Sequence, residues 1–442
     1  MMPPTMPQTL LENVTVVMPA SLPSQWRNAE EVNSYLIDGG LVLYIGLLVL
    51  FVWRIVCYWR CCGRWLQYAN YCSLMLVLLL LLYGYDIYMF SQAALSTTGR
   101  TAWDDLPGWL RPVILSGPVF SVLTYLMCFM QTFQHVERIR EESAIKRHDR
   151  AVMIIMLPAV YGAMAMTSLT RMYKLVITPD VLDDEIEIQL MKSETCFWVG
   201  DLYESWVLYQ FGKLTLELIE SSIARQGRSA REEERAASRA LMVAHTAVES
   251  LAWVGILSFL VVCVLQAGWS LWILCFTPKE DQVTSFKASM SQFTAAGFLA
   301  SGAAIYNVFV VETTFHHFLE GYMPFLKFLT VKILVTFAFF QKGFFKAAVL
   351  FQDNLLPGLK DVPIIGEIVN FPPVKFEIFY ASLLIIECFL VAIMHLWAWN
   401  VSEEWYDELE YDRSGDISGG ASRSILEGQV GVESGSKKYG SM

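Results

Sequence analysis

The chain has 442 residues, of which 55% are hydrophobic and 17% are charged, whereas roughly a quarter of the residues of an ordinary soluble protein are charged. Its formal net charge is −11, from 43 acidic and 32 basic side chains, and these lie mainly in the connections and the tail. This composition excludes a soluble enzyme, a secreted disulfide scaffold and a nucleic-acid-binding domain. It predicts an all-α polytopic membrane protein.

Nine apolar runs are long enough to cross a hydrocarbon core of about 30 Å. The predicted spans cover residues 39–59, 68–91, 112–134, 151–173, 197–219, 246–276, 291–312, 326–350 and 373–399. Each is predicted to be a helix, because unpaired backbone groups are too costly in lipid. We expect Pro158 to kink the fourth span, since a proline removes one hydrogen bond of the helix.

The segments outside the spans differ in composition. Residues 1–37 are polar and proline-rich and are predicted to form a luminal or extracellular tail. Residues 38–92 contain the first two spans and are predicted to be a two-helix extension. Residues 401–442 pass from an acidic, aromatic stretch to a Gly/Ser-rich run that cannot build a core, which predicts a disordered cytoplasmic tail.

The basic residues of the connections predict the orientation in the membrane, because cytoplasmic connections carry an excess of Lys and Arg. The first, third and fifth connections are rich in bases, namely Arg54, Arg60 and Arg64, then Arg138, Arg140, Lys146, Arg147 and Arg150, then Arg225, Arg228, Arg231, Arg235 and Arg239. All three lie on one side if the N-terminus is outside or luminal and the C-terminus is cytoplasmic. In that orientation the sequon at Asn13 can carry a glycan, whereas the sequon at Asn400 cannot.

Three cysteines, Cys57, Cys61 and Cys62, follow the first span on the predicted cytoplasmic side, among Arg54, Arg60 and Arg64. This setting is typical of reversible S-acylation. Unmodified thiols at the membrane interface are the alternative interpretation.

Motifs of enzymes and metal sites are absent from the sequence. It contains no phosphate-binding GxxxxGK[ST] loop, no HExxH, no GxSxG and no Cys/His spacing of a zinc site. We therefore expect no catalytic residue, no metal, no cofactor and no nucleic-acid partner.

Three stretches in the C-terminal two-thirds resemble the organic solute transporter alpha-subunit superfamily, which includes the plant Lazarus-type proteins. The first is Tyr203-Glu204-Ser205-Trp206-Val207-Leu208-Tyr209-Gln210-Phe211. The second runs from Pro324 through Lys327-Phe328-Leu329-Thr330-Val331-Lys332 to Phe340-Gln341, and the third is Glu387-Cys388-Phe389 with His395. The resemblance covers about residues 112–400 and implies a seven-helix transporter core there, preceded by the two extra spans.

The sequence departs from the family pattern at several places. Phe340 stands where the family has tryptophan, and the Cys-Lys-x-Gly segment before the fifth family helix is missing. The chain is therefore a divergent member by this resemblance, and its substrate need not be of the bile-acid or steroid-conjugate class. Animal members work with a small single-span partner subunit, and such a subunit or a homodimer is the partner that the resemblance implies.

Ionisable residues within spans are costly in lipid and are therefore candidate functional residues. Glu204, Tyr209, Lys332 and Glu387 are the candidate substrate-binding residues, with packing between helices as the alternative role. Counting at 1.5 Å per residue places Lys332 and Glu387 at the same height, about 9 Å above the cytoplasmic boundary. We expect these two to pair inside the bundle. Lys327, near the boundary, is expected to extend its ammonium to water.

The resulting hypothesis is an ATP-independent transporter or facilitator of amphipathic organic solutes in the plasma membrane or an endomembrane of the vacuole or endosome. The alternative is a membrane scaffold, trafficking or receptor-like protein without transport activity. A central cavity lined by charged and polar groups would favour the transporter, and a solid apolar core would favour the scaffold.

Overall fold

The structure is a computed structural model that describes residues 39–59, 64–104, 106–141, 145–178, 181–229, 232–319, 321–351 and 364–406. In this part of the chain every element is a helix, which confirms the all-α class. Asn13, Cys61 and Cys62 lie outside the described residues. Cys57 belongs to the last turns of α2 (Gly39–Trp59), where the backbone alone is described.

Each predicted span falls on helices of the described chain, several of which extend well beyond the predicted bounds. The long helices are α3 (Arg64–Leu95), α5 (Leu110–Glu141), α6 (Ile145–Ile155), α7 (Leu157–Ile177), α8 (Asp183–Ser229), α9 (Glu232–Phe276), α10 (Lys279–Phe315), α11 (Pro324–Phe351) and α13 (Pro373–Ala398). Six helical stretches of the described residues are long and apolar enough to cross a membrane. The protein is thus a polytopic membrane protein.

The fourth predicted span is divided at Met156, where α6 ends and α7 begins. Pro158 lies in the first turn of α7. A proline has no N–H and cannot donate to the carbonyl four residues earlier, but it is well tolerated in a first turn, where the N–H has no helical partner. The structure thus divides the helix two residues before Pro158, the residue at which a kink was predicted.

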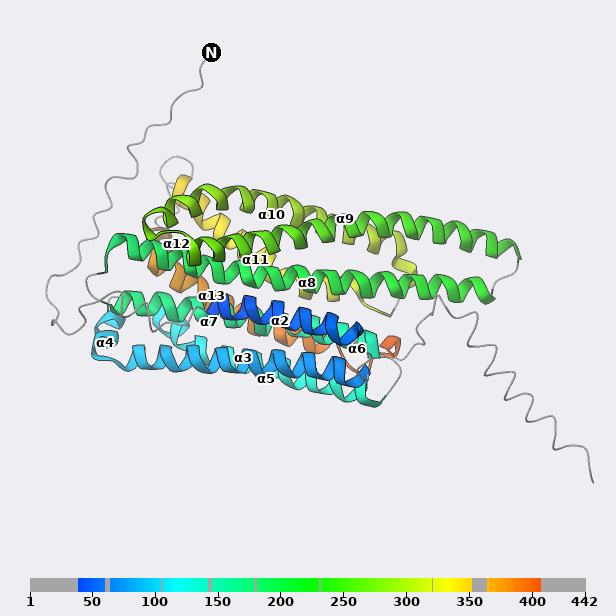
Figure 1. Ribbon diagram of the computed structural model, residues 1–442, viewed down its shortest axis with the longest axis horizontal. Coiled ribbons are helices and arrows are strands. Elements are labelled where there is room, and N and C mark those ends of the chain that lie inside the picture. The colour runs from blue at the N-terminus through cyan, green and yellow to red at the C-terminus, as the bar shows by residue number, and fades with distance from the viewer. Residues whose placement is uncertain are drawn as a thin grey trace, which may run out of the picture.

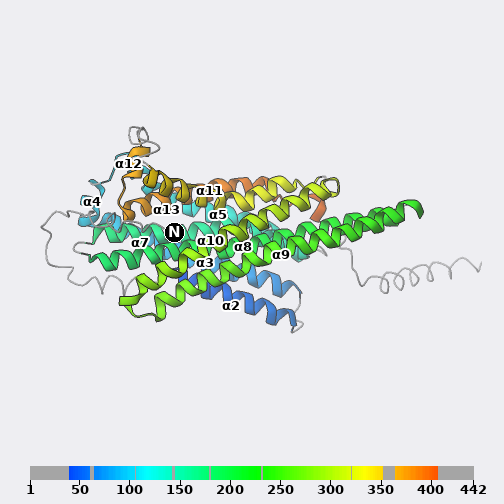
Figure 2. The same ribbon diagram turned by 90° about the horizontal axis from the view of Figure 1, so that it is seen from above.

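Helix α7 lies at the centre of the bundle, and all residues from Arg147 to Tyr173 are buried. It packs against α3, α5, α8 and α13, while α9 and α10 pack beside α8, and α11 packs between α8 and α13. Figures 1 and 2 show these helices running along the long axis of the molecule. Their outward faces carry exposed apolar side chains such as Leu81, Trp272 and Phe298, as expected for contact with lipid.

Helices α2 and α3 form an outer layer on α7. Tyr83 of α3 donates to the carbonyl oxygen of Ala159 at 2.7 Å, and Thr167 of α7 donates to the Asp86 carboxylate at 2.6 Å. These two bonds satisfy polar groups that would otherwise be buried without a partner. The structure thus assigns Asp86, the acidic residue of α3, a role in fastening this layer to α7.

Helices α8 and α9 extend past the other helices at one end of the bundle, which we call the hairpin end (Figure 2). The short helices α4 (Thr97–Asp104) and α12 (Ile365–Val369) lie at the opposite end (Figure 1). The base-rich connections α5–α6 and α8–α9 are both at the hairpin end, whereas the acidic first turn of α8, with Asp183, Asp184 and Glu185, is at the other. Lys and Arg residues therefore gather at the hairpin end, whereas the opposite end carries the acidic first turn of α8.

Candidate functional site

A buried ion pair joins α11 to α8 inside the bundle. The Lys332 ammonium donates to Oε1 of Glu204 at 2.9 Å. Glu204 is fully buried, and Lys332 is 4% exposed. The ammonium also lies 4.5 Å from the ring centre of Phe259 on α9. A cation held over an aromatic face is attracted to it, so three helices contribute to this position.

A second carboxylate lies one turn earlier on α8. Asp201 and Glu204 are three residues apart and therefore project from the same face of the helix. The Tyr161 hydroxyl of α7 donates to Asp201 Oδ1 at 2.7 Å. This contact requires Gly200, because a Cβ there would lie 2.9 Å from Cε2 of Tyr161. Two acidic side chains and one basic side chain thus meet at the centre of the bundle.

The thiol of Cys263 completes this cluster from α9. It is buried and lies one helical turn after Phe259, whose ring contacts the Lys332 ammonium, so both residues are on the same side of α9. We call Tyr161, Asp201, Glu204, Cys263 and Lys332 the central cluster. Sequence reasoning found Glu204 and Lys332 and missed the other three. The spacing of Asp201 from Glu204 was the one signal that could have identified a further member.

One oxygen of the central cluster has unused hydrogen-bonding capacity. Glu204 Oε2 is buried and has no hydrogen-bond partner among the described residues. A buried polar atom without a partner costs about 1–3 kcal/mol. Such an atom beside an ion pair can accept a hydrogen bond from a bound molecule, and the ammonium of Lys332 can attract an anionic group.

Glu387 of α13 forms a separate contact with α11. It accepts a hydrogen bond from the Gln341 side chain, and its Oε2 has no partner among the described residues. The predicted pairing of Lys332 with Glu387 is therefore wrong. Lys332 binds Glu204 on α8, and Glu387 binds Gln341.

Helix rotation explains this correction. Lys332 and Gln341 are nine residues apart, which turns the helix by about 900° and places them on opposite faces. One face of α11 meets α8 and the other meets α13. Counting residues estimates a height along the axis but not the direction of a side chain. In addition, α8 begins at Asp183 rather than at residue 197, so Glu204 lies about 32 Å from its start.

Tyr209 lies between α8 and α9, away from the central cluster. Its ring stacks on Trp206 with 5.4 Å between ring centres and contacts Trp253 of α9 at 5.1 Å. Five residues turn a helix by about 500°, so Tyr209 and Glu204 face different directions. The structure thus brings together two of the four candidate residues, Glu204 and Lys332, and places Tyr209 and Glu387 elsewhere.

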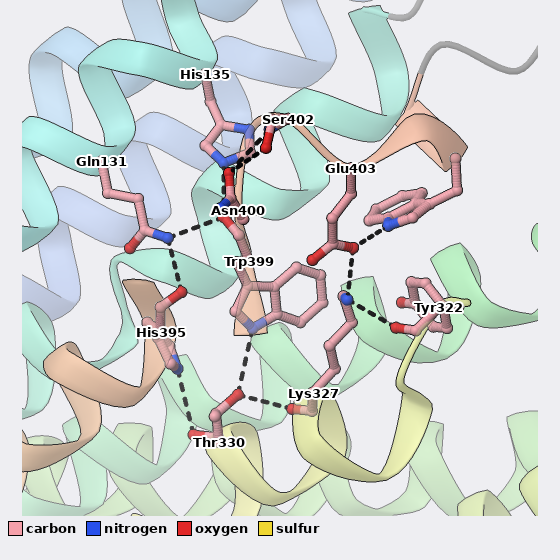
Figure 3. Close-up of polar contacts among 11 residues, drawn as sticks. Gln131, His135, Tyr322, Lys327, Thr330, His395, Trp399, Asn400, Ser402 and Glu403 are labelled. Atoms are coloured by element: carbon pink, nitrogen blue, oxygen red, sulfur yellow. Dashed lines mark hydrogen bonds and ion pairs between the residues drawn. The ribbon is translucent and has the colours of Figure 1, made fainter. Parts of the chain in front are cut away.

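A second group of polar contacts lies at the hairpin end, where the chain turns back against the bundle after α13 (Figure 3). We call residues 399–406 the cap. The Trp399 carbonyl accepts hydrogen bonds from Gln131 at 2.9 Å and His135 at 3.1 Å, both on α5. The Trp405 carbonyl accepts one from Arg147 of α6. The cap thus joins helices that are far apart in the sequence.

Lys327, at the start of α11, binds the cap from the other side. Its ammonium donates to Glu403 Oε2 and to the Tyr322 carbonyl, both at 2.7 Å (Figure 3). It also lies within 5.5 Å of the ring centres of Tyr322, Trp399 and Trp405. The expectation that Lys327 extends to water is wrong, because the side chain is fully buried.

The cap also corrects the predicted start of the tail. Trp405 and Tyr406 are buried, and Glu404–Tyr406 forms a short 3-10 helix. The disordered tail predicted from residue 401 therefore does not begin there, and residues 407–442 lie outside the described part. The Trp-Tyr pair among acidic residues was the signal of a packed segment, since two large aromatic rings gain much from burial.

The hydrogen-bond pattern assigns the tautomers of two histidines beside the cap. The Trp399 carbonyl can only accept, so Nε2 of His135 carries the hydrogen. In the neutral form of His135, Nδ1 is an acceptor, and Nδ1 of His148, at 2.9 Å, donates to it. Tyr406 stacks on His148, and burial raises the pKa of the Tyr406 hydroxyl above its ordinary value.

Comparison with known protein families identifies the family of this chain. The family model described as "Organic solute transporter Ostalpha" matches residues 113–404. This range runs from α5 to the cap and includes the central cluster. No curated protein and no solved structure matches the chain.

Proposed function

We propose that this chain, which belongs to the organic solute transporter Ostalpha family and is a membrane transporter of organic solutes, moves amphipathic solutes without using ATP. The observation that carries the proposal is the buried pair of Lys332 and Glu204. Replacing a buried ion pair by well-packed apolar side chains is often neutral or stabilising, so a purely structural core does not need a pair at this depth.

The chemistry of the central cluster supports a solute with an apolar body and one polar group. The Lys332 ammonium can attract a carboxylate or sulfate, while the unused oxygen of Glu204 can accept from a hydroxyl of the same molecule. The ring of Phe259 offers an apolar surface beside them. Glu387 and Gln341, about 13.5 Å further along α11 from Lys332, provide a second polar position on the path.

Uptake into proteoliposomes tests this function. Purified full-length protein is reconstituted without nucleotide, and uptake is measured for a panel of sterol-like and other amphipathic anions, with protein-free liposomes as the control. We expect saturable uptake down the gradient for at least one solute class. If no solute of the panel enters faster than into protein-free liposomes, the transport proposal fails and the scaffold alternative is favoured.

We further propose that the N-terminus faces the outside or the lumen and the hairpin end faces the cytoplasm. The gathering of basic residues at the hairpin end supports this orientation. We expect an epitope at residue 1 to be accessible from outside, and one at residue 442 only after permeabilisation. Asn13→Gln should remove a glycosidase-sensitive shift in mobility, whereas Asn400→Gln should not. An accessible C-terminal epitope on intact cells or sealed vesicles would refute this topology.

A further inference from the structure

The cap and the central cluster act on the same helix. Lys327, which binds Glu403 of the cap, precedes Lys332 on α11 by five residues, or about 7.5 Å along the axis. A helix moves as a rigid rod over such a length. Any displacement of α11 from the cap must therefore also shift Lys332 relative to Glu204.

The contact between α11 and the cap leaves buried hydrogen-bonding capacity unused. Glu403 Oε2 accepts from Lys327 and from the Trp405 indole, but Glu403 Oε1 has no partner among the described residues. The Tyr406 hydroxyl is also buried without a partner in that part of the chain. Water could form hydrogen bonds with both atoms if the cap separated from the bundle. The closed arrangement therefore leaves two buried polar atoms without a hydrogen bond.

The backbone has an unusual conformation directly before α11 and again directly before α12. Met323, directly before the helix, has a φ of 49°, and Gly321 has a φ of 83°. Ile364, the first described residue after α11, has a φ of 70°. Met323 and Ile364 are the two non-glycine residues with positive φ in the described part of the chain. Strained residues of this kind concentrate at segments that change conformation.

We propose that α11 is a moving helix of the transport cycle and that the Lys327–Glu403 contact is the latch that holds it closed at the hairpin end. When the latch is formed, the cap covers this end and the central cluster is sealed. When it opens, α11 turns about the Gly321–Met323 segment and water and solute reach Glu204 and Lys332. This inference rests on the proposed function, because it describes access to the same cluster.

The native thiol of Cys263 can report the opening. It is buried in the central cluster, whereas Cys128 and Cys388 are buried on α5 and α13. Full-length protein in lipid nanodiscs is treated with a membrane-impermeant methanethiosulfonate reagent, and modification of each cysteine is followed by peptide mass spectrometry. Opening of the latch should expose Cys263 selectively, whereas unfolding should expose all three.

The test variant is Lys327→Met with Glu403→Gln, which removes the latch without leaving a buried charge unpaired. We expect modification of Cys263 to become at least ten-fold faster, with Cys128 and Cys388 unchanged. The charge exchange Lys327→Glu with Glu403→Lys should return the rate at least half-way to that of the wild type. The matched control is Arg150→Met with Glu217→Gln, which removes an ion pair between α6 and α8 at the same end and should leave the Cys263 rate unchanged.

An unchanged Cys263 rate in the folded double variant overturns the latch. An equal rise at all three cysteines also overturns it, because the cap would then be a structural element alone. The two proposals fail separately. If the wild type carries no solute of the panel while Cys263 still responds to the latch, the transport proposal fails and the mobile latch stands.

Discussion

Replacing Lys332 by methionine should abolish solute uptake and destabilise the protein by about 3–5 kcal/mol, because Glu204 would remain charged, buried and unpaired. The double variant Lys332→Met with Glu204→Gln removes both charges. Its melting temperature in detergent should return close to that of the wild type, whereas its uptake into proteoliposomes should remain at least ten-fold reduced. The two measurements separate a role in transport from a role in folding.

An exposed ion pair provides the control for this prediction. Lys287 and Glu187 are 3.0 Å apart at the end opposite the hairpin end, with both side chains largely exposed. Surface pairs contribute about 0–1 kcal/mol, so Lys287→Met with Glu187→Gln should change neither uptake nor melting temperature appreciably. Normal uptake by the double variant of Lys332 and Glu204 would assign their pair a purely structural role.

Trp399→Ala should destabilise the protein by about 3–5 kcal/mol, the range for removing a large aromatic side chain from a packed core. Trp399 is fully buried, its indole donates to the Thr330 hydroxyl at 3.2 Å, and its ring lies edge-on to Phe211. The centre of its ring also lies 5.5 Å from the Lys327 ammonium. Thermal unfolding of the purified protein measures the loss.

Trp397, two residues earlier, is the matched control because its side chain is 69% exposed. Trp397→Ala should change stability by no more than about 0.5 kcal/mol, as is usual for surface substitutions. Equal losses for the two variants would show that the cap does not pack as the structure describes.

The membrane class, the position of the helices and the interruption near Pro158 were predictable because each depends on local properties. The length of an apolar run decides whether it can cross lipid, and a proline acts on its own turn of helix. The motifs around Glu204, Lys332 and Glu387 predicted the family, which the match over residues 113–404 confirms. The placement of Lys332 and Gln341 on opposite faces of α11 also followed from their spacing alone.

The partners of the charged residues were not predictable in this way. Lys332 binds Glu204 rather than Glu387 because pairing depends on how α8, α11 and α13 are rotated against one another. Asp201 and Cys263 enter the central cluster through the same packing. The roles of Tyr209 and Glu387 in solute binding remain predictions that uptake by substituted protein can test.

The sequence by itself thus determined that the chain crosses the membrane as helices, where the apolar part of each helix lies and which residues carry costly charges within them. These properties are set by hydropathy and backbone geometry over a few turns. The tertiary structure alone decided that Lys327 is enclosed by the cap, that Glu403 is its partner and that Lys332 faces α8. Such contacts join residues 76 and 128 positions apart, and their geometry arises only when the packed faces of several helices meet.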